Sequence, residues 1–138
     1  RQVLHHSVPL VRSMDDYMEC PHSRWTEVRR EDILKHPELC ILAESEEAGV
    51  LLLMDKEGRQ IFVQGHPEYD RMTLDSEYRR DKARGMEPTI PLHYYENDDP
   101  SGRPLLSWRN MANTLYTNWL NYYVYQVTPY LLEEGEKP

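Results

Sequence analysis

Short apolar runs separated by polar turns dominate the first half of the chain. Residues 39–43 and 50–54 are almost wholly apolar over strand length, which is typical of buried strands. Residues 60–64 follow the second run after the turn 55–58. This spacing predicts a β-hairpin in which Gly58 supplies a positive φ. We therefore expect a small β-sheet in this part of the chain.

The second half reads as two helices joined by a long loop. The first helix is predicted to begin at Thr73 as its N-cap, with Glu77 close to capping-box spacing, and to end at Gly85. Residues 86–107 are rich in Pro, Asn, Asp and Gly, which predicts a long surface loop. Residues 108–126 carry apolar side chains at nearly helical period and predict the second helix. These side chains are Met111, Leu115, Trp119, Tyr122 and Tyr123.

The first 36 residues give weaker signals. Residues 1–12 contain a proline and no helical period, so we expect irregular chain or an edge strand there. Residues 13–29 are predicted to be mainly loop. Residues 30–36 are predicted to form a short helix with Ile33 and Leu34 as its buried side. Strands interspersed with helices indicate an α/β fold.

Composition narrows the class of protein. The 138 residues fit one domain or part of one. The chain has 16 Lys and Arg against 24 Asp and Glu, a net charge of −8, which argues against nucleic-acid binding. No apolar run approaches the roughly 20 residues of a membrane span, and no signal-peptide pattern opens the chain. Two cysteines without CxxC spacing favour a reducing compartment, so a cytoplasmic protein is expected. The six histidines show no HExxH spacing, and we expect no metal.

The tripeptide His-Pro-Glu occurs twice, in different contexts. His36 and Glu38 follow a short polar helix, where the tripeptide serves best as a helix stop. His66 and Glu68 follow an apolar strand and Gly65, at the end of the strand where ligands gather in α/β folds. A histidine there can accept a proton, and a carboxylate two residues on can hold its tautomer. The pattern leaves a catalytic pair and a structural histidine both open.

A pair of this kind needs a nucleophile, and neither cysteine is convincing. Cys40 lies in an apolar run, where burial would make it inert, and Cys20 is expected in an exposed loop beside a proline. Arg79 and Arg80 follow the pair on the predicted helix. Either could bind a carboxylate, although pairing with Glu77 or Asp81 at the surface is the simpler reading.

The sequence resembles the homoserine O-acyltransferases of methionine biosynthesis, also called the homoserine O-succinyltransferase family. The resemblance covers nearly the whole chain and is most specific in its last long segment. It rests on residues 21–24 (Pro-His-Ser-Arg), 43–46 (Ala-Glu-Ser-Glu), 61–70, 73–74, 77–78, 80–81, 98–100, 107–109 and 118–130.

The resemblance implies a fold related to class I glutamine amidotransferases, with a flavodoxin-like sheet, and a ping-pong reaction. A cysteine takes an acyl group from acyl-CoA as a thioester, and homoserine then attacks through its hydroxyl. By the same resemblance, His66 is the proton acceptor and Glu68 orients it. Ser23 and Arg80 bind homoserine. Acyl-CoA is a co-substrate, and no resident cofactor is implied.

The resemblance also implies that the chain is the C-terminal portion of one acyltransferase domain, with the nucleophilic cysteine and the residue that selects the acyl donor upstream of Arg1. We therefore expect the chain alone to be inactive. The donor is acetyl-CoA or succinyl-CoA, with acetyl slightly favoured, and a homodimer is expected. Two alternatives stay open: an amidotransferase-like hydrolase, and a non-catalytic binding or oligomerisation module that uses the helix around Trp119, Tyr122 and Tyr123.

Overall fold

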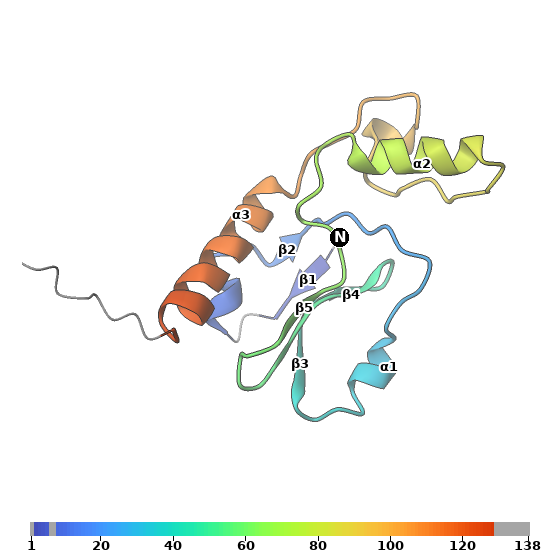
Figure 1. Ribbon diagram of the computed structural model, residues 1–138. Helices are drawn as coiled ribbons and strands as arrows, with labels where there is room; N and C mark the ends of the chain where they lie inside the picture. Colours follow the sequence, from blue (N-terminus) through green and yellow to red (C-terminus); the bar gives the residue numbers. More distant parts are fainter. Residues whose placement is uncertain (1, 6–7, 129–138) are drawn as a thin grey trace, which may run out of the picture.

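Five short strands form one antiparallel sheet in the computed structural model, which describes residues 2–5 and 8–128 (Figure 1). The order across the sheet is β2-β1-β3-β4-β5, and each strand runs antiparallel to its neighbours. The mixed α/β character predicted from the sequence is confirmed. The strands are β1 (Gln2–Leu4), β2 (Tyr17–Met18), β3 (Leu39–Ser45), β4 (Gly49–Asp55) and β5 (Ile61–Val63).

The β3, β4 and β5 strands form where the apolar runs predict them. The turn between β4 and β5 is closed by the carboxylate of Asp55, which accepts hydrogen bonds from the amides of Arg59 and Gln60. Gly58 has the expected positive φ of 72°. A side chain at this glycine would also meet the ring of Tyr123, so the turn packs closely against the end of the last helix.

The first strand departs from the prediction of irregular chain or edge strand. β1 lies inside the sheet, where Val3 pairs with Tyr17 on one side and with Glu44 on the other. The β2 strand takes the edge instead. Because β1 has only three residues, its alternation of buried and exposed side chains is too short to read from the sequence.

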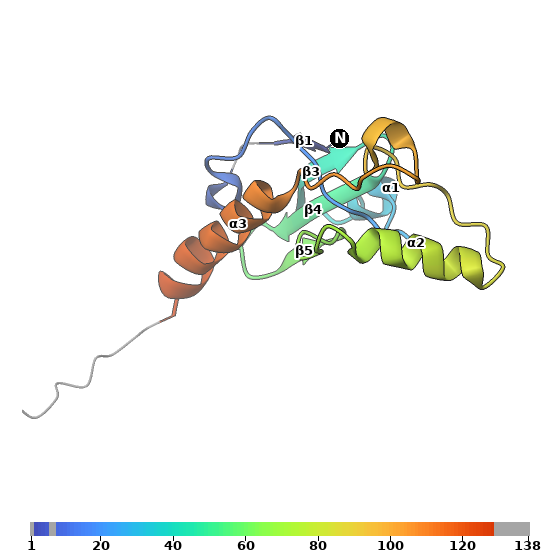
Figure 2. The same ribbon diagram turned by 90° about the horizontal axis from the view of Figure 1, so that it is seen from above.

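Helices cover both sides of this sheet (Figures 1 and 2). The short α1 helix (Arg30–Ile33) buries Ile33 against Val50 and Leu53 of β4. The prediction that Leu34 is buried was wrong, since it caps the helix and is exposed. The α3 helix (Arg109–Asn118) packs on the other side of the sheet, where Leu115 joins the main apolar core.

The helix predicted over residues 108–126 is confirmed in position but changes type along its length. The α3 helix is followed by a π-helix, η3 (Trp119–Tyr125). At their junction the buried amide of Asn118 donates hydrogen bonds to the carbonyls of Leu10 and Arg12, near the 3-10 turn η1 (Pro9–Val11). None of the helices in the described part of the chain is long and apolar enough to cross a membrane.

The α2 helix (Thr73–Ala83) stands at the end of the sheet, together with the segment 86–107 (Figure 1). The prediction of Thr73 as N-cap was wrong. Met72 occupies that position, and Thr73 begins the helix without a side-chain cap. The capping-box reading fails because the carboxylate of Glu77 bonds to a tyrosine before the helix instead.

The segment 86–107 is only partly the surface loop that its composition predicts. It contains the 3-10 turn η2 (Glu96–Asp98), but Tyr94 and Tyr95 are buried. With Leu74 and Trp108 they form a second apolar cluster. This cluster joins α2 to the start of α3 and gives the end of the sheet a core of its own.

Candidate functional site

The second His-Pro-Glu tripeptide begins directly after β5, and a glycine sets its position. A Cβ atom at Gly65 would lie 2.7 Å from the side chain of Leu51, 2.9 Å from Cys20 Sγ and 2.9 Å from the carbonyl oxygen of Pro21. The chain at Gly65 can therefore pass close to the loop 20–25. The next amide, that of His66, donates to the same Pro21 carbonyl at 2.8 Å.

The side chains of His66 and Glu68 form the expected pair. Nδ1 of His66 lies 2.9 Å from Glu68 Oε1, and Nε2 lies 3.3 Å from the backbone oxygen of Ser23. The carboxylate favours the tautomer with its proton on Nδ1. The Ser23 carbonyl can only accept as well, so Nε2 accepts a proton only when a substrate hydroxyl replaces this contact. The imidazole is about one-third exposed, so a substrate can reach it.

Tyr69 holds the imidazole from its face, and nothing in the sequence analysis had singled it out. Its ring stacks on His66 with centroids 4.3 Å apart and planes 15° from parallel. Its hydroxyl donates to Glu77 Oε1 at 2.9 Å, and its backbone oxygen accepts from Trp108 Nε1 at 3.0 Å. Burial, and then the bond to Glu77, raise the pKa of Tyr69 to about 12. The phenol therefore stays protonated as a donor.

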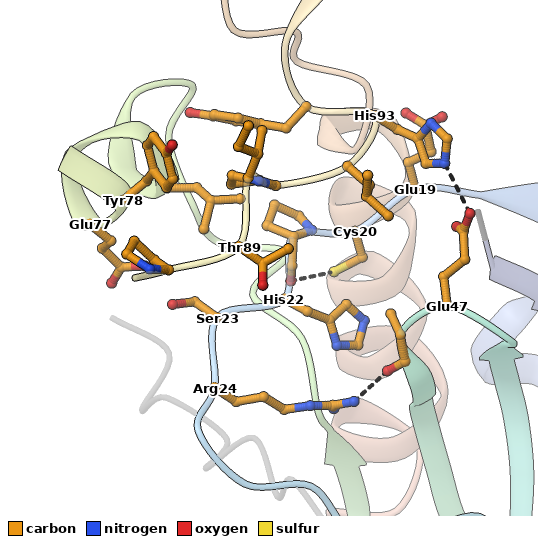
Figure 3. A pocket seen from close by; sticks show the side chains of 18 of the residues that line it. Glu19, Cys20, His22, Ser23, Arg24, Glu47, Glu77, Tyr78, Thr89 and His93 are labelled. Atoms are coloured by element: carbon orange, nitrogen blue, oxygen red, sulfur yellow. Dashed lines mark hydrogen bonds and ion pairs between the residues drawn. The ribbon is translucent and has the colours of Figure 1, made fainter. Parts of the chain in front are cut away.

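A cavity of about 540 Å³ opens between the loop 20–25, α2 and the segment 87–94 (Figure 3). Ser23 and Arg80, both proposed from the family resemblance, line it, whereas His66 and Glu68 do not. The His66 imidazole borders the cavity at Ser23, because its Nε2 faces the backbone carbonyl oxygen of Ser23. The four candidate residues thus lie around one region, with the His66 imidazole at its edge.

The two arginines of α2 differ in what they contact. Arg79 donates to both carboxylate oxygens of Asp75 at 2.9 Å and to the carbonyl of Pro100. The expected pairing with Glu77 or Asp81 was wrong for Arg79, because Asp75 lies one turn earlier on the same side of the helix. It is confirmed for Arg80, which pairs with Asp81. Arg80 bonds to Asp81 through Nε and faces the cavity. Arg79 is therefore structural, and Arg80 is available to a ligand.

Neither cysteine has the surroundings of an activated thiol. Cys20 was expected to be exposed, but it packs against the main core beneath Gly65. Burial raises the pKa of its thiol to about 12, so it remains protonated near neutral pH. Cys40 lies on β3, where it is partly buried against the same core. The position of Cys20 could not be read from the sequence, since it depends on contact with a distant glycine.

His22 is a second histidine of the cavity wall that sequence reasoning passed over. Its Nε2 lies 3.1 Å from the side-chain nitrogen of Gln2, and both residues line the cavity. Burial, followed by the charge of Arg24, lowers the pKa of His22 to about 4. His22 is therefore neutral at physiological pH. Across residues 2–5 and 8–128, no three His, Cys, Asp or Glu side chains group closely enough to hold a metal ion.

The chain is similar in sequence to known proteins of one family. The sequence profile of the homoserine O-succinyltransferase family matches residues 1–130. Homoserine O-acetyltransferase of Agathobacter rectalis is 60% identical over 129 residues, which cover 94% of this chain and 42% of that protein. The enzymes of the same name from Lachnospira eligens and Lachnoclostridium phytofermentans are 56% and 61% identical, over 97% and 95% of this chain.

The chain spans 42–44% of the length of these three relatives. The profile match, in contrast, covers nearly the whole of the chain, including both the loop 20–25 and the second tripeptide. The chain therefore belongs to the homoserine O-succinyltransferase family.

Proposed function

We propose that these residues form the homoserine side of a homoserine O-acyltransferase of methionine biosynthesis. The observation that supports this most is the placing of the pair His66–Glu68 at the edge of a cavity lined by Ser23 and Arg80. A base next to a pocket with a guanidinium suits a substrate that carries both a hydroxyl and a carboxylate.

In the proposed reaction, His66 Nε2 removes the proton of the homoserine hydroxyl as its oxygen attacks an acyl thioester. Glu68 holds the imidazole by Nδ1 and stabilises the imidazolium that forms. The thiolate leaves as the ester bond forms, and it can take the proton from the imidazolium. Arg80 binds the substrate carboxylate through the guanidinium nitrogens not used by Asp81, and Ser23 contributes to the same pocket.

We propose that another part of the protein supplies the thioester-forming cysteine. The raised pKa of Cys20 and its packed position argue against it, and the relatives are more than twice as long as this chain. The chain would then be one portion of a single acyltransferase domain with a class I glutamine amidotransferase-like fold. The mixed α/β character and the pair that follows β5 support this reading. The 138 residues alone are expected to be inactive.

The acyl donor is proposed to be acetyl-CoA. The three relatives described above are all named homoserine O-acetyltransferase, and that name supports acetyl over succinyl. No observation favours the hydrolase or the binding module. On the π-helix, Tyr123 packs against the main core and the Tyr122 hydroxyl accepts from Arg12, so only part of the expected interface is free. The homodimer stays a prediction.

The test is a chimera in which this chain replaces the matching segment of the Agathobacter rectalis relative. With acetyl-CoA and homoserine it should form O-acetylhomoserine, detected by mass spectrometry. Arg80→Ala should raise KM for homoserine about 10- to 100-fold, because a charged hydrogen bond to the carboxylate is lost. Arg84→Ala, at the exposed end of α2, is the control and should leave KM unchanged. A chimera that folds and binds acetyl-CoA but makes no ester would overturn the proposal.

A further inference from the structure

Every unpartnered buried polar side-chain atom in the described part of the chain belongs to a residue of the same cavity. These atoms are Gln2 Oε1, His22 Nδ1 and Glu77 Oε2. Buried polar groups in proteins nearly always have a hydrogen-bond partner, and those without one call for an explanation. Their concentration around one cavity indicates that a polar ligand completes the bonding there.

Glu77 has the strongest requirement of the three, because it is a carboxylate and can only accept. Its Oε1 is satisfied by the hydroxyl of Tyr69, which leaves Oε2. The neighbouring cations do not serve it, since Arg79 bonds to Asp75 and Arg80 bonds to Asp81. The missing partner is therefore a donor, and a positively charged donor satisfies a carboxylate best.

The position of Glu77 suits an amino-acid ligand. It lies three residues before Arg80 on α2, a spacing that puts both side chains on the same side of the helix. Figure 3 shows Glu77 and Ser23 together on one side of the cavity. A carboxylate and a guanidinium one turn apart match the ammonium and carboxylate groups of an α-amino acid. The terminal torsion of a glutamate is broad, so Oε2 can turn toward the cavity that the side chain lines.

We propose that Glu77 binds the ammonium group of the acyl acceptor, and that Tyr69 holds Glu77 and His66 at a fixed separation. This rests on the proposed function. The Tyr69 ring stacks on the imidazole while its hydroxyl bonds to the carboxylate. The substrate amine and the general base are thereby linked through the Tyr69 side chain, and the Tyr69 backbone oxygen accepts a hydrogen bond from the indole of Trp108. Tyr69 is a positioning residue, and Glu77 is a specificity residue.

The test compares homoserine with 4-hydroxybutanoate, which keeps the hydroxyl and the carboxylate but lacks the amine. In the chimera, Glu77→Gln should lower kcat/KM for homoserine about 10- to 100-fold, mainly through KM. It should leave kcat/KM for 4-hydroxybutanoate within about threefold, because that substrate never uses the carboxylate. Glu77→Asp keeps the charge and should retain part of the discrimination. Glu96→Gln, an exposed position on η2, is the charge-matched control.

Tyr69→Phe separates the two roles. It keeps the stacked ring but removes the bond to Glu77, so KM for homoserine should rise about 3- to 10-fold. The transfer rate at saturating homoserine should not change, because the stacked ring still holds His66. Acylation by acetyl-CoA precedes homoserine and should be normal in every variant.

Three outcomes are decisive. Equal losses with both substrates in Glu77→Gln would make Glu77 structural and overturn the inference. No loss with either substrate in a folded Glu77→Gln variant would overturn it as well. A chimera that becomes acylated but never transfers to homoserine would instead refute the proposed function, whatever Glu77 does.

Discussion

The two His-Pro-Glu tripeptides form the same local pair in very different surroundings. Nδ1 of His36 lies 3.2 Å from Glu38 Oε1, and Nδ1 of His66 lies 2.9 Å from Glu68 Oε1. The first imidazole is 60% exposed, whereas the second is 33% exposed and stacks on Tyr69. The tripeptide alone therefore brings a histidine and a carboxylate together. The second tripeptide forms a candidate site because Tyr69 and the cavity lie beside it.

The largest difference between the two copies should be seen in catalysis. In the chimera, His66→Ala should lower the rate of acyl transfer to homoserine about 10²- to 10⁴-fold, the usual contribution of a general base. His36→Ala should leave the rate unchanged, since this imidazole faces solvent away from the cavity lining. Steady-state assays of both variants decide the point. Equal effects would remove the distinction between the copies.

The residue before each tripeptide gives the next contrast. Gly65→Ala should destabilise the fold by about 1–3 kcal/mol, because the added carbon meets the Pro21 backbone and two packed side chains. Transfer should fall about 10-fold or more as the imidazole shifts. Lys35→Ala, the matching position before His36, lies at an exposed turn and should change neither quantity. Urea unfolding of the chimera is the measurement, and an alanine tolerated equally at both positions would contradict the account.

The residue after each tripeptide offers a smaller test. Tyr69→Leu gives the second copy the sequence of the first, in which Leu39 follows Glu38. The variant loses the stacked ring and the bond to Glu77, so transfer should fall about 10-fold. Leu39→Tyr should gain no activity. A Tyr69→Leu chimera with the full transfer rate would show that the ring does not position the base.

Acid should lower the stability of the region around the second tripeptide through the neighbouring His22. Burial, and then Arg24, lower the pKa of His22 to about 4, against about 6.5 in an unfolded chain. Between these two pKa values the unfolded state binds the proton more readily than the folded state. The contribution of neutral His22 to the unfolding free energy is therefore complete above about pH 6.5. It falls as the pH drops toward 4.

His22→Gln should therefore flatten the dependence of the unfolding free energy on pH between about 6.5 and 4. The change is small but specific, because His22 sits in the loop whose Pro21 and Ser23 carbonyls contact His66. Urea unfolding at several pH values measures it. NMR of the His22 ring should also show a neutral imidazole at pH 6, and a ring that titrates near 6.5 would contradict this assignment.

The comparison of the two tripeptides also shows which features could be predicted from the sequence. The β3, β4 and β5 strands are apolar runs between turn residues, so their pattern predicts them. The pair at His66 and Glu68 is local and was also predictable. Family resemblance supplied Ser23 and Arg80, which local spacing could not.

The residues that were missed act through contacts between distant segments. Tyr69 bonds to Trp108 from 39 residues away, and Cys20 packs beneath Gly65. Glu77 had the spacing of a capping box, but it bonds to Tyr69 instead because α2 starts without a side-chain cap. The β1 strand has only three residues, so no period could identify it. Each miss reflects tertiary contact overriding a local pattern.

A single-turnover experiment isolates the step in which His66 acts. The chimera and its His66→Ala variant are acylated with acetyl-CoA, freed of excess donor and mixed with homoserine, and intact mass is followed over time. We expect the bound acetyl group to leave the unsubstituted chimera as O-acetylhomoserine, and to remain on any acylated His66→Ala protein at least about 100-fold longer. Equal transfer from both proteins would contradict the assignment of His66 as the base.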